Sequence, residues 1–132
     1  MLNEALCLVC VSALWGLTNP IIKRNSKGIK DINCESNIRQ FWSELKFLVT
    51  NLNYLMPMGI NQLGSILYFI ALQHIDLTLS VPVANSLTFV FTAISGFFLG
   101  ECLPRRGTIV GICCVLFGTI LCCYDKYIIE NP

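Results

Sequence analysis

The sequence predicts an all-α membrane protein with four transmembrane helices and one interfacial amphipathic helix between the first and second spans. Of its 132 residues, 55% are hydrophobic and only 13% are charged, whereas about 25% of an average soluble domain is charged. The apolar residues form four blocks of 18 to 21 residues, and none of these blocks contains Asp, Glu, Lys, Arg or His. The blocks are residues 5–22, 54–72, 79–99 and 107–124, which we interpret as one integral membrane domain over residues 1–132.

The length of each block fits a bilayer. At 1.5 Å per residue a block covers about 27 to 32 Å, and the hydrocarbon core is about 30 Å thick. Helices are expected because every backbone polar group in lipid needs an internal partner. A soluble four-helix bundle would show a polar face on each helix, and these blocks do not.

The basic residues predict the orientation. Eight of the nine Lys and Arg residues lie between the first and second blocks or between the third and fourth, and only Lys126 lies on the other side. By the positive-inside rule, the first and third loops are cytosolic and both termini are lumenal or exterior. Nothing in the sequence indicates which membrane holds the protein. The eight residues are Lys23, Arg24, Lys27, Lys30, Arg39, Lys46, Arg105 and Arg106.

The first span has one face of small and polar residues. Ser12, Gly16 and Asn19 recur at helical spacing, and Trp15 lies beside them. A close helix–helix seam and a ligand-facing surface both fit this pattern. We expect no signal-peptide cleavage, because the apolar run continues to residue 22 and the positive charges follow it.

The loop over residues 23–53 contains an amphipathic helix at about 37–52. Its apolar residues recur at helical spacing from Ile38 to Leu52, with Trp42 among them and Ser36 as a candidate N-cap. The segment is too short and too charged to span a bilayer. It is expected to lie along the cytosolic interface, and binding to a partner protein is the alternative.

The second and third spans also carry polar stripes. Asn61 and Ser65 follow one face of the second span with Gln62 beside it, and Asn85 and Thr88 follow one face of the third. Such residues form hydrogen bonds between helices or line a polar path. The candidate path is therefore Trp15, Asn19, Asn61, Gln62, Ser65, Asn85 and Thr88.

Glu101 ends the third span at the predicted cytosolic boundary. A carboxylate is unfavourable at a helix C-terminus, so an ion pair with Arg105 and Arg106 is expected. A gating or proton-linked carboxylate is the alternative. In the fourth span Gly107, Gly111 and Gly118 share one face, which predicts a packing seam within the bundle or in a dimer.

No catalytic or metal-binding motif occurs in the sequence. Cys7 and Cys10 form a CxxC without a second ligand pair, and His74 has no nucleophile or metal-ligand companion. Cys34 and Cys102 fall on the predicted cytosolic, reducing side, and their role is undetermined. We expect no enzyme activity, no cofactor, no metal and no nucleic-acid partner.

Several short motifs are similar to those of a known family. They are WGLTNP (15–20), YLMP (54–57), DLTLSVP (76–82), PVANS (82–86) and LGE (99–101), followed by Gly107 and Gly111. On these motifs the chain resembles the transmembrane protein 234 family, a branch related to the drug/metabolite transporter superfamily. The resemblance implies four helices like those of small multidrug-resistance proteins, and it implies no particular substrate. Those proteins couple transport to a glutamate within the first span, but here Glu4 lies only at its outer edge, so their mechanism does not carry over.

Two functions follow from these observations. The first is a drug/metabolite-transporter-like protein that moves a small solute of unknown identity along the candidate path. The alternative is a structural or accessory membrane subunit that packs against a partner. The charge bias fixes one orientation, so a dimer would be parallel, and a complex with another membrane protein is the other arrangement. The two functions differ in whether Asn61 and Asn85 face a hydrated cavity or are bonded in a dry seam.

Overall fold

The computed structural model describes residues 2–102, 104–130 and 132, and most of them lie in helices. No strand occurs among these residues, and the all-α prediction is confirmed. The elements in chain order are α1 (Leu2–Asn25), the short 3-10 helix η1 (Lys27–Asp31), α2 (Asn37–Thr50), α3 (Leu52–Ala71), α4 (Leu77–Phe98) and α5 (Arg106–Glu130).

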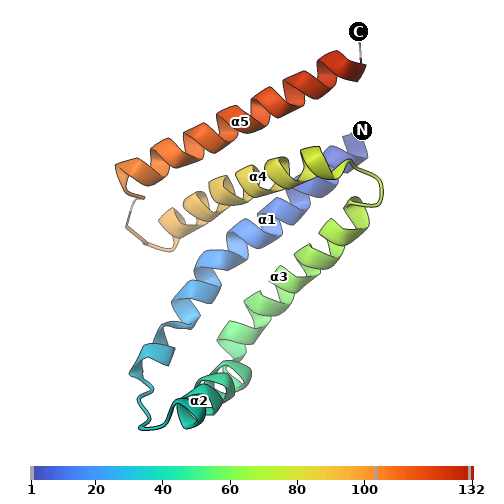
Figure 1. Ribbon diagram of the computed structural model, residues 1–132. Coiled ribbons are helices and arrows are strands. Elements are labelled where there is room, and N and C mark those ends of the chain that lie inside the picture. The colour runs from blue at the N-terminus through green and yellow to red at the C-terminus, as the bar shows by residue number, and fades with distance from the viewer. Residues whose placement is uncertain (1, 103, 131) are drawn as a thin grey trace.

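α1 lies at the centre of the arrangement. It packs against α3 on one side and α4 on the other, whereas α5 packs chiefly against α4 and α2 packs against α3 (Figure 1). The two termini and the α3–α4 connection lie at one end of the molecule. η1, α2 and the α4–α5 connection lie toward the other end, and we call it the basic end because Lys23, Arg24 and Lys27 are there.

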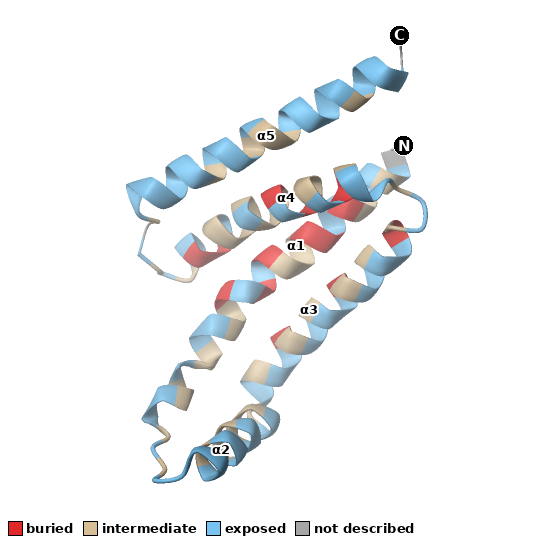
Figure 2. Ribbon diagram, viewed as in Figure 1, coloured by how far each residue is buried: buried red, intermediate tan, exposed pale blue. Residues whose placement is uncertain are grey.

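Two glycines allow α1 to approach its neighbours closely. A Cβ atom on Gly16 would lie 2.3 Å from the Cβ of Phe91 on α4, and one on Gly64 of α3 would lie 3.0 Å from the Trp15 ring of α1. Small residues permit this kind of backbone contact between membrane helices. The buried residues, among them Val11, Ser12 and Ala84, accordingly gather along α1 and the helices beside it (Figure 2).

Two helices extend past their predicted ends. α1 continues through Pro20 to Asn25, which places Lys23 and Arg24 in its last turn. Positive charge at this end of a helix interacts favourably with the helix dipole. α5 continues past residue 124 to Glu130. In that extension Lys126 forms ion pairs with Asp76 at the start of α4 and with Glu130 one turn further along.

The amphipathic helix is present as α2, and it ends at Thr50 because the chain turns at Asn51 into α3. Side-chain amides hold this turn: Asn25 donates to the Asn53 carbonyl at 2.6 Å, and Asn51 donates to the Asn25 carbonyl at 3.4 Å. Ser36 is at the N-cap position, but its side chain forms no capping hydrogen bond there. None of the residues of α2 is buried.

Within the described residues, three helices are long and apolar enough to cross a membrane: Asn3–Asp31, Leu77–Phe98 and Arg106–Glu130. α3 has 20 residues and lies along α1. It is not one of the three, and Pro57, Asn61 and Gln62 in its middle reduce its hydropathy.

Candidate functional site

Three residues of the predicted polar path are bonded between α1 and α3. The indole nitrogen of Trp15 donates to the backbone carbonyl of Asn61 at 3.2 Å. The amide of Asn61 donates to Thr18 Oγ1 at 2.8 Å and to Asn19 Oδ1 at 3.3 Å. The Trp15 ring also contacts Tyr68 edge to face, with ring centroids 5.2 Å apart. These contacts make an interhelical seam, and they use the polar groups that a solute path would need.

The other predicted path residues are separated from that seam. Gln62 and Asn85 are exposed, and the Thr88 hydroxyl donates to the Ala84 carbonyl within α4 at 2.7 Å. α1 lies between α3 and α4, so Asn61 and Asn85 do not face one another. Ser65 is half-buried on α3. The seven residues therefore do not surround a single cavity in one chain.

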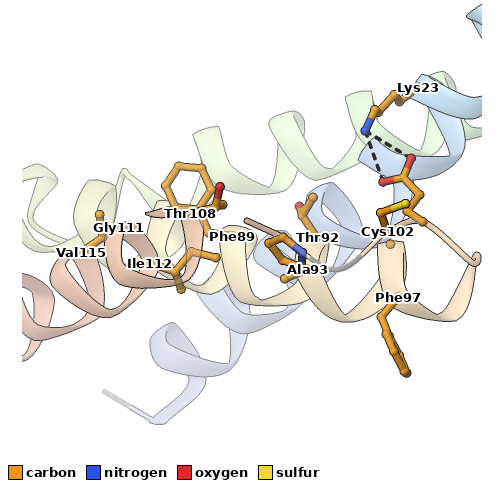
Figure 3. A pocket seen from close by; sticks show the side chains of 13 residues that line it. Lys23, Phe89, Thr92, Ala93, Phe97, Cys102, Thr108, Gly111, Ile112 and Val115 are labelled. Carbon is orange, nitrogen blue, oxygen red and sulfur yellow. Dashed lines mark hydrogen bonds and ion pairs between the residues drawn. The ribbon is translucent and has the colours of Figure 1, made fainter. Parts of the chain in front are cut away.

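A hollow lies between α4 and α5, near the basic end. This α4–α5 cleft has a volume of about 520 Å³ and is mostly apolar. Figure 3 shows side chains from both helices around it, with Lys23 of α1 at one end. Its lining comprises Lys23, Phe89, Thr92, Ala93, Gly96, Phe97, Glu101, Cys102, Pro104, Thr108, Gly111, Ile112 and Val115.

An ion pair lies at the basic end of the cleft. Lys23 Nζ is 3.3 Å from both carboxylate oxygens of Glu101 (dashed lines in Figure 3). The sequence suggested Arg105 and Arg106 as the partners of Glu101, and it did not suggest Lys23 of α1.

The turn after α4 explains the pairing. Gly100 has φ +77°, and the Glu101 N–H bonds back to the Gly96 carbonyl at 2.9 Å while the Gly100 N–H bonds to the Phe97 carbonyl at 3.1 Å. This is a Schellman C-cap, which needs a left-handed residue such as glycine. It folds the Glu101 side chain over Gly96, where a Cβ would lie 3.3 Å from the carboxylate. The carboxylate is thereby directed toward α1.

One polar atom in the cleft has no partner. Thr92 Oγ1 is buried, and no hydrogen bond reaches it among the described residues. A buried hydroxyl without a partner costs about 1–3 kcal/mol. Its neighbour one turn along, Ser95, instead donates to the Gly16 carbonyl of α1 at 2.9 Å. Thr92 thus lines the cleft with a hydroxyl that is covered by the surrounding atoms and forms no hydrogen bond with the described residues.

Polar contacts farther along α4 and α5 hold the two helices together. The hydroxyls of Ser86 and Thr119 are 2.5 Å apart, and Thr119 also lies 3.4 Å from the Pro82 carbonyl. Lys126 and Asp76 pair near the end that carries the termini. The cleft occupies the part of the α4–α5 interface between these contacts and the basic end.

The glycine stripe of α5 is open. A Cβ atom added at Gly107, Gly111 or Gly118 would meet no atom within 4 Å, and no residue of α5 is buried. Gly111 also lines the cleft, so the stripe borders it. The stripe is therefore not a seam within this chain, and a seam with a second chain stays a prediction.

All eight cysteines are free, and the described residues contain no group of three His, Cys, Asp or Glu side chains that could hold a metal ion. Cys34 lies 3.8 Å from the Ser43 hydroxyl, and Cys102 lines the cleft.

Comparison with known proteins identifies the family. A family model described as "Putative transmembrane family 234" matches residues 8–123, which is most of the chain. The chain belongs to this family. A transmembrane protein 234 homolog from Anopheles gambiae is 47% identical over 121 residues, covering 92% of this chain and 86% of that protein. A transmembrane protein 234 homolog from Dictyostelium discoideum is 38% identical over 120 residues, covering 91% and 94%. No solved structure matches.

Family membership and the apolar helices together identify a multi-pass integral membrane protein of transmembrane family 234. Its site residues are only partly those that the sequence singled out. Asn85 and Thr88 are not among the residues that line the cleft, whereas Thr92 and Gly96, farther along the same helix, are. The contribution of Lys23 was missed, because only the folded chain brings the end of α1 next to the end of α4.

Proposed function

We propose that this member of transmembrane family 234 is a four-span membrane subunit that assembles through α5. One observation carries the proposal: α5 packs chiefly against α4, and its three aligned glycines are open. Lipid is as apolar as the helix itself, so association in a membrane depends on close packing rather than on burial. Three small residues on one face offer that packing to a second backbone.

The proposal also states that α3 crosses the membrane together with the other three long helices, and on which side of the membrane each end of the molecule lies. α3 pairs with α1 through the Asn61 contacts, which satisfy polar groups that would otherwise lower its preference for lipid. The charge bias then places the basic end in the cytosol and both termini outside. The proposed partner is a second copy, and because this bias fixes a single orientation, the two copies would lie parallel. No catalytic step is assigned to the chain.

Oligomer mass measures the assembly. The purified chain in lipid nanodiscs should have the mass of a dimer, and Gly111→Leu and Gly118→Leu should each convert it to a monomer. Gly59→Leu is the matched control, because Gly59 is on α3 and is likewise open. A wild-type monomer would contradict the proposal. A dimer that persists in both α5 variants would contradict the role of the stripe, and a co-purifying foreign membrane protein in place of a second copy would contradict self-assembly.

Transport of a small solute is a second candidate, favoured by the α4–α5 cleft. Such a role would agree with the expected relation of this family to the drug/metabolite transporter superfamily. A cleft of about 520 Å³ is within the range of about 300–1,000 Å³ typical of small-molecule sites. In reconstituted vesicles, flux should fall with Thr92→Val and Ala93→Phe, which alter the cleft. The flux should be unchanged in Asn85→Leu. A loss of flux in Asn85→Leu, with normal flux in Thr92→Val and Ala93→Phe, would contradict a route through the cleft.

A further inference from the structure

We propose that the α4–α5 cleft binds an anionic phospholipid of the cytosolic leaflet. In this arrangement one acyl chain occupies the cleft, and the phosphate contacts the basic surface formed by Lys23, Arg24 and Lys27. The inference depends on only one part of the proposed function, namely that α4 and α5 cross the membrane with their connection in the cytosol.

The cleft suits an acyl chain. Phe89 and Ala93 of α4 and Ile112 and Val115 of α5 supply apolar walls along its length. Because α5 packs chiefly against α4, the flanks of the cleft are open to the hydrocarbon. A lipid tail can therefore enter sideways, without a route through water.

A polar hollow continues from the cleft at the basic end. It is lined by Lys23, Arg24, Lys27, Leu99, Gly100, Glu101 and Cys102. Lys23, Glu101 and Cys102 belong to both hollows. The second hollow carries three cations and one carboxylate, so it is complementary to an anion. Basic clusters beside membrane helices on the cytosolic side attract anionic lipid headgroups.

Thr92 provides a contact between these two regions. It lies four residues before Gly96, or about one helical turn deeper than the Glu101 carboxylate. Its buried hydroxyl has no partner in the chain. In a phospholipid the ester carbonyl lies between the phosphate and the acyl chain, and it can accept a hydrogen bond from this hydroxyl once the Thr92 side chain turns from its covered position toward the cleft.

Glu101 competes with the phosphate for Lys23. The ammonium of Lys23 contacts both carboxylate oxygens, yet its side chain remains 68% exposed. It can therefore turn to a phosphate without a large structural change. Removing the charge of Glu101 should strengthen anion binding, which distinguishes a lipid site from a merely structural ion pair.

Charge favours a lipid over a second copy in this hollow. The basic end of a second copy placed in this hollow would set its own Lys23, Arg24 and Lys27 against the same three cations, and like charges repel. A free phosphate would use the basic hollow but would leave the apolar cleft unfilled.

The test is a titration of the purified full-length chain followed by native mass spectrometry. The probes are dioleoylphosphatidylserine, dioleoylphosphatidylcholine and inorganic phosphate. We expect phosphatidylserine to bind about tenfold more tightly than phosphatidylcholine, and phosphate alone to bind far more weakly. Equal affinity for the two lipids would overturn the proposal. Phosphate binding as tight as that of phosphatidylserine would show a free-anion site instead.

Charge variants locate the headgroup. The triple variant Lys23→Gln, Arg24→Gln, Lys27→Gln should weaken phosphatidylserine binding about tenfold, and Glu101→Gln should strengthen it about threefold. The matched control, Lys30→Gln, Arg39→Gln, Lys46→Gln, removes the same charge from outside the hollow. An equal loss in the control, or no gain in Glu101→Gln, would overturn the assignment.

Cleft variants locate the acyl chain. Ala93→Phe should fill the cleft and abolish the preference for phosphatidylserine, whereas Ile94→Phe, at the next residue and outside the lining, should not. Thr92→Val should weaken binding about threefold, whereas Thr88→Val should not. The Thr92 hydroxyl forms no bond within the fold, so the folded state should persist. Unchanged lipid binding in both Ala93→Phe and Thr92→Val would overturn the proposal.

Labelling of the α4–α5 connection from each side of the membrane tests the topology separately.

Discussion

Lys23, in the last turn of α1, lies 3.3 Å from both carboxylate oxygens of Glu101, just past the end of α4. Because Lys23 is largely exposed, this pair contributes no more than about 1 kcal/mol to folding. The Gly100 turn, rather than the ion pair, directs Glu101 toward α1. The relationship matters chiefly because it places a cation and an anion at the mouth of the α4–α5 cleft.

Gly100→Ala should therefore destabilise the chain. An L-residue in the left-handed conformation costs about 1–2 kcal/mol, and Gly100 has φ +77°. Unfolding in mixed micelles with an increasing fraction of denaturing detergent measures the loss. The control Gly59→Ala lies in helical α3 with open space around it and should be neutral or stabilising by about 0.5–1 kcal/mol. A neutral Gly100→Ala would contradict the Schellman turn.

Gly16→Ala should disrupt the contact between α1 and α4. Its new Cβ would lie 2.3 Å from the Phe91 Cβ and 3.0 Å from the Thr88 carbonyl oxygen. The helices must then separate, and overpacking of this kind costs about 1–3 kcal/mol. The same unfolding measurement applies. A stability equal to that of Gly59→Ala would show that the two helices are farther apart than described here.

Asn61→Leu should destabilise the chain, and Asn85→Leu should not. Asn61 donates to Thr18 and Asn19, and such bonds between membrane helices contribute about 0.6–2 kcal/mol. Asn85 is exposed on α4. Equal effects of the two substitutions on unfolding would indicate that both residues belong to one shared interior.

Thr119→Val should loosen α5 from α4. It removes the hydroxyl that contacts Ser86 at 2.5 Å and the Pro82 carbonyl at 3.4 Å. Hydrogen exchange should speed up in α5 while α1 keeps its protection, because α1 does not depend on α5 for its packing. The control is Thr108→Val, an exposed threonine of the same helix. Faster exchange throughout the chain would contradict an independently packed core of α1, α3 and α4.

Much of the fold could be predicted from the sequence. Uninterrupted apolar blocks and the spacing from Ile38 to Leu52 are local signals, and helices follow from them directly. The ends of the helices were predicted less accurately than their existence. α1 continues through Pro20 to Asn25, past its predicted end at residue 22, although a proline removes one backbone hydrogen bond.

The site was harder to predict, because it depends on which faces meet. The sequence showed the polar stripes on α1 and α3. Periodicity indicates which residues share a face of a helix, but not which other helix that face packs against. Asn61 therefore proved to be bonded to α1, and Asn85 lies on the other side of that helix. The partner of Glu101 depended on the backbone turn at Gly100, whereas the sequence favoured its near neighbours Arg105 and Arg106.

The most direct test of assembly through α5 uses two native cysteines. Cys114 lies between Gly111 and Gly118 on the glycine face, and Cys113 lies on a different face at the same depth. Both are exposed. Two variants would each keep one of these as the only cysteine and be oxidised in native membranes. The proposal predicts a covalent dimer through Cys114 and little through Cys113. No dimer through Cys114, or equal yields from the two, would contradict it.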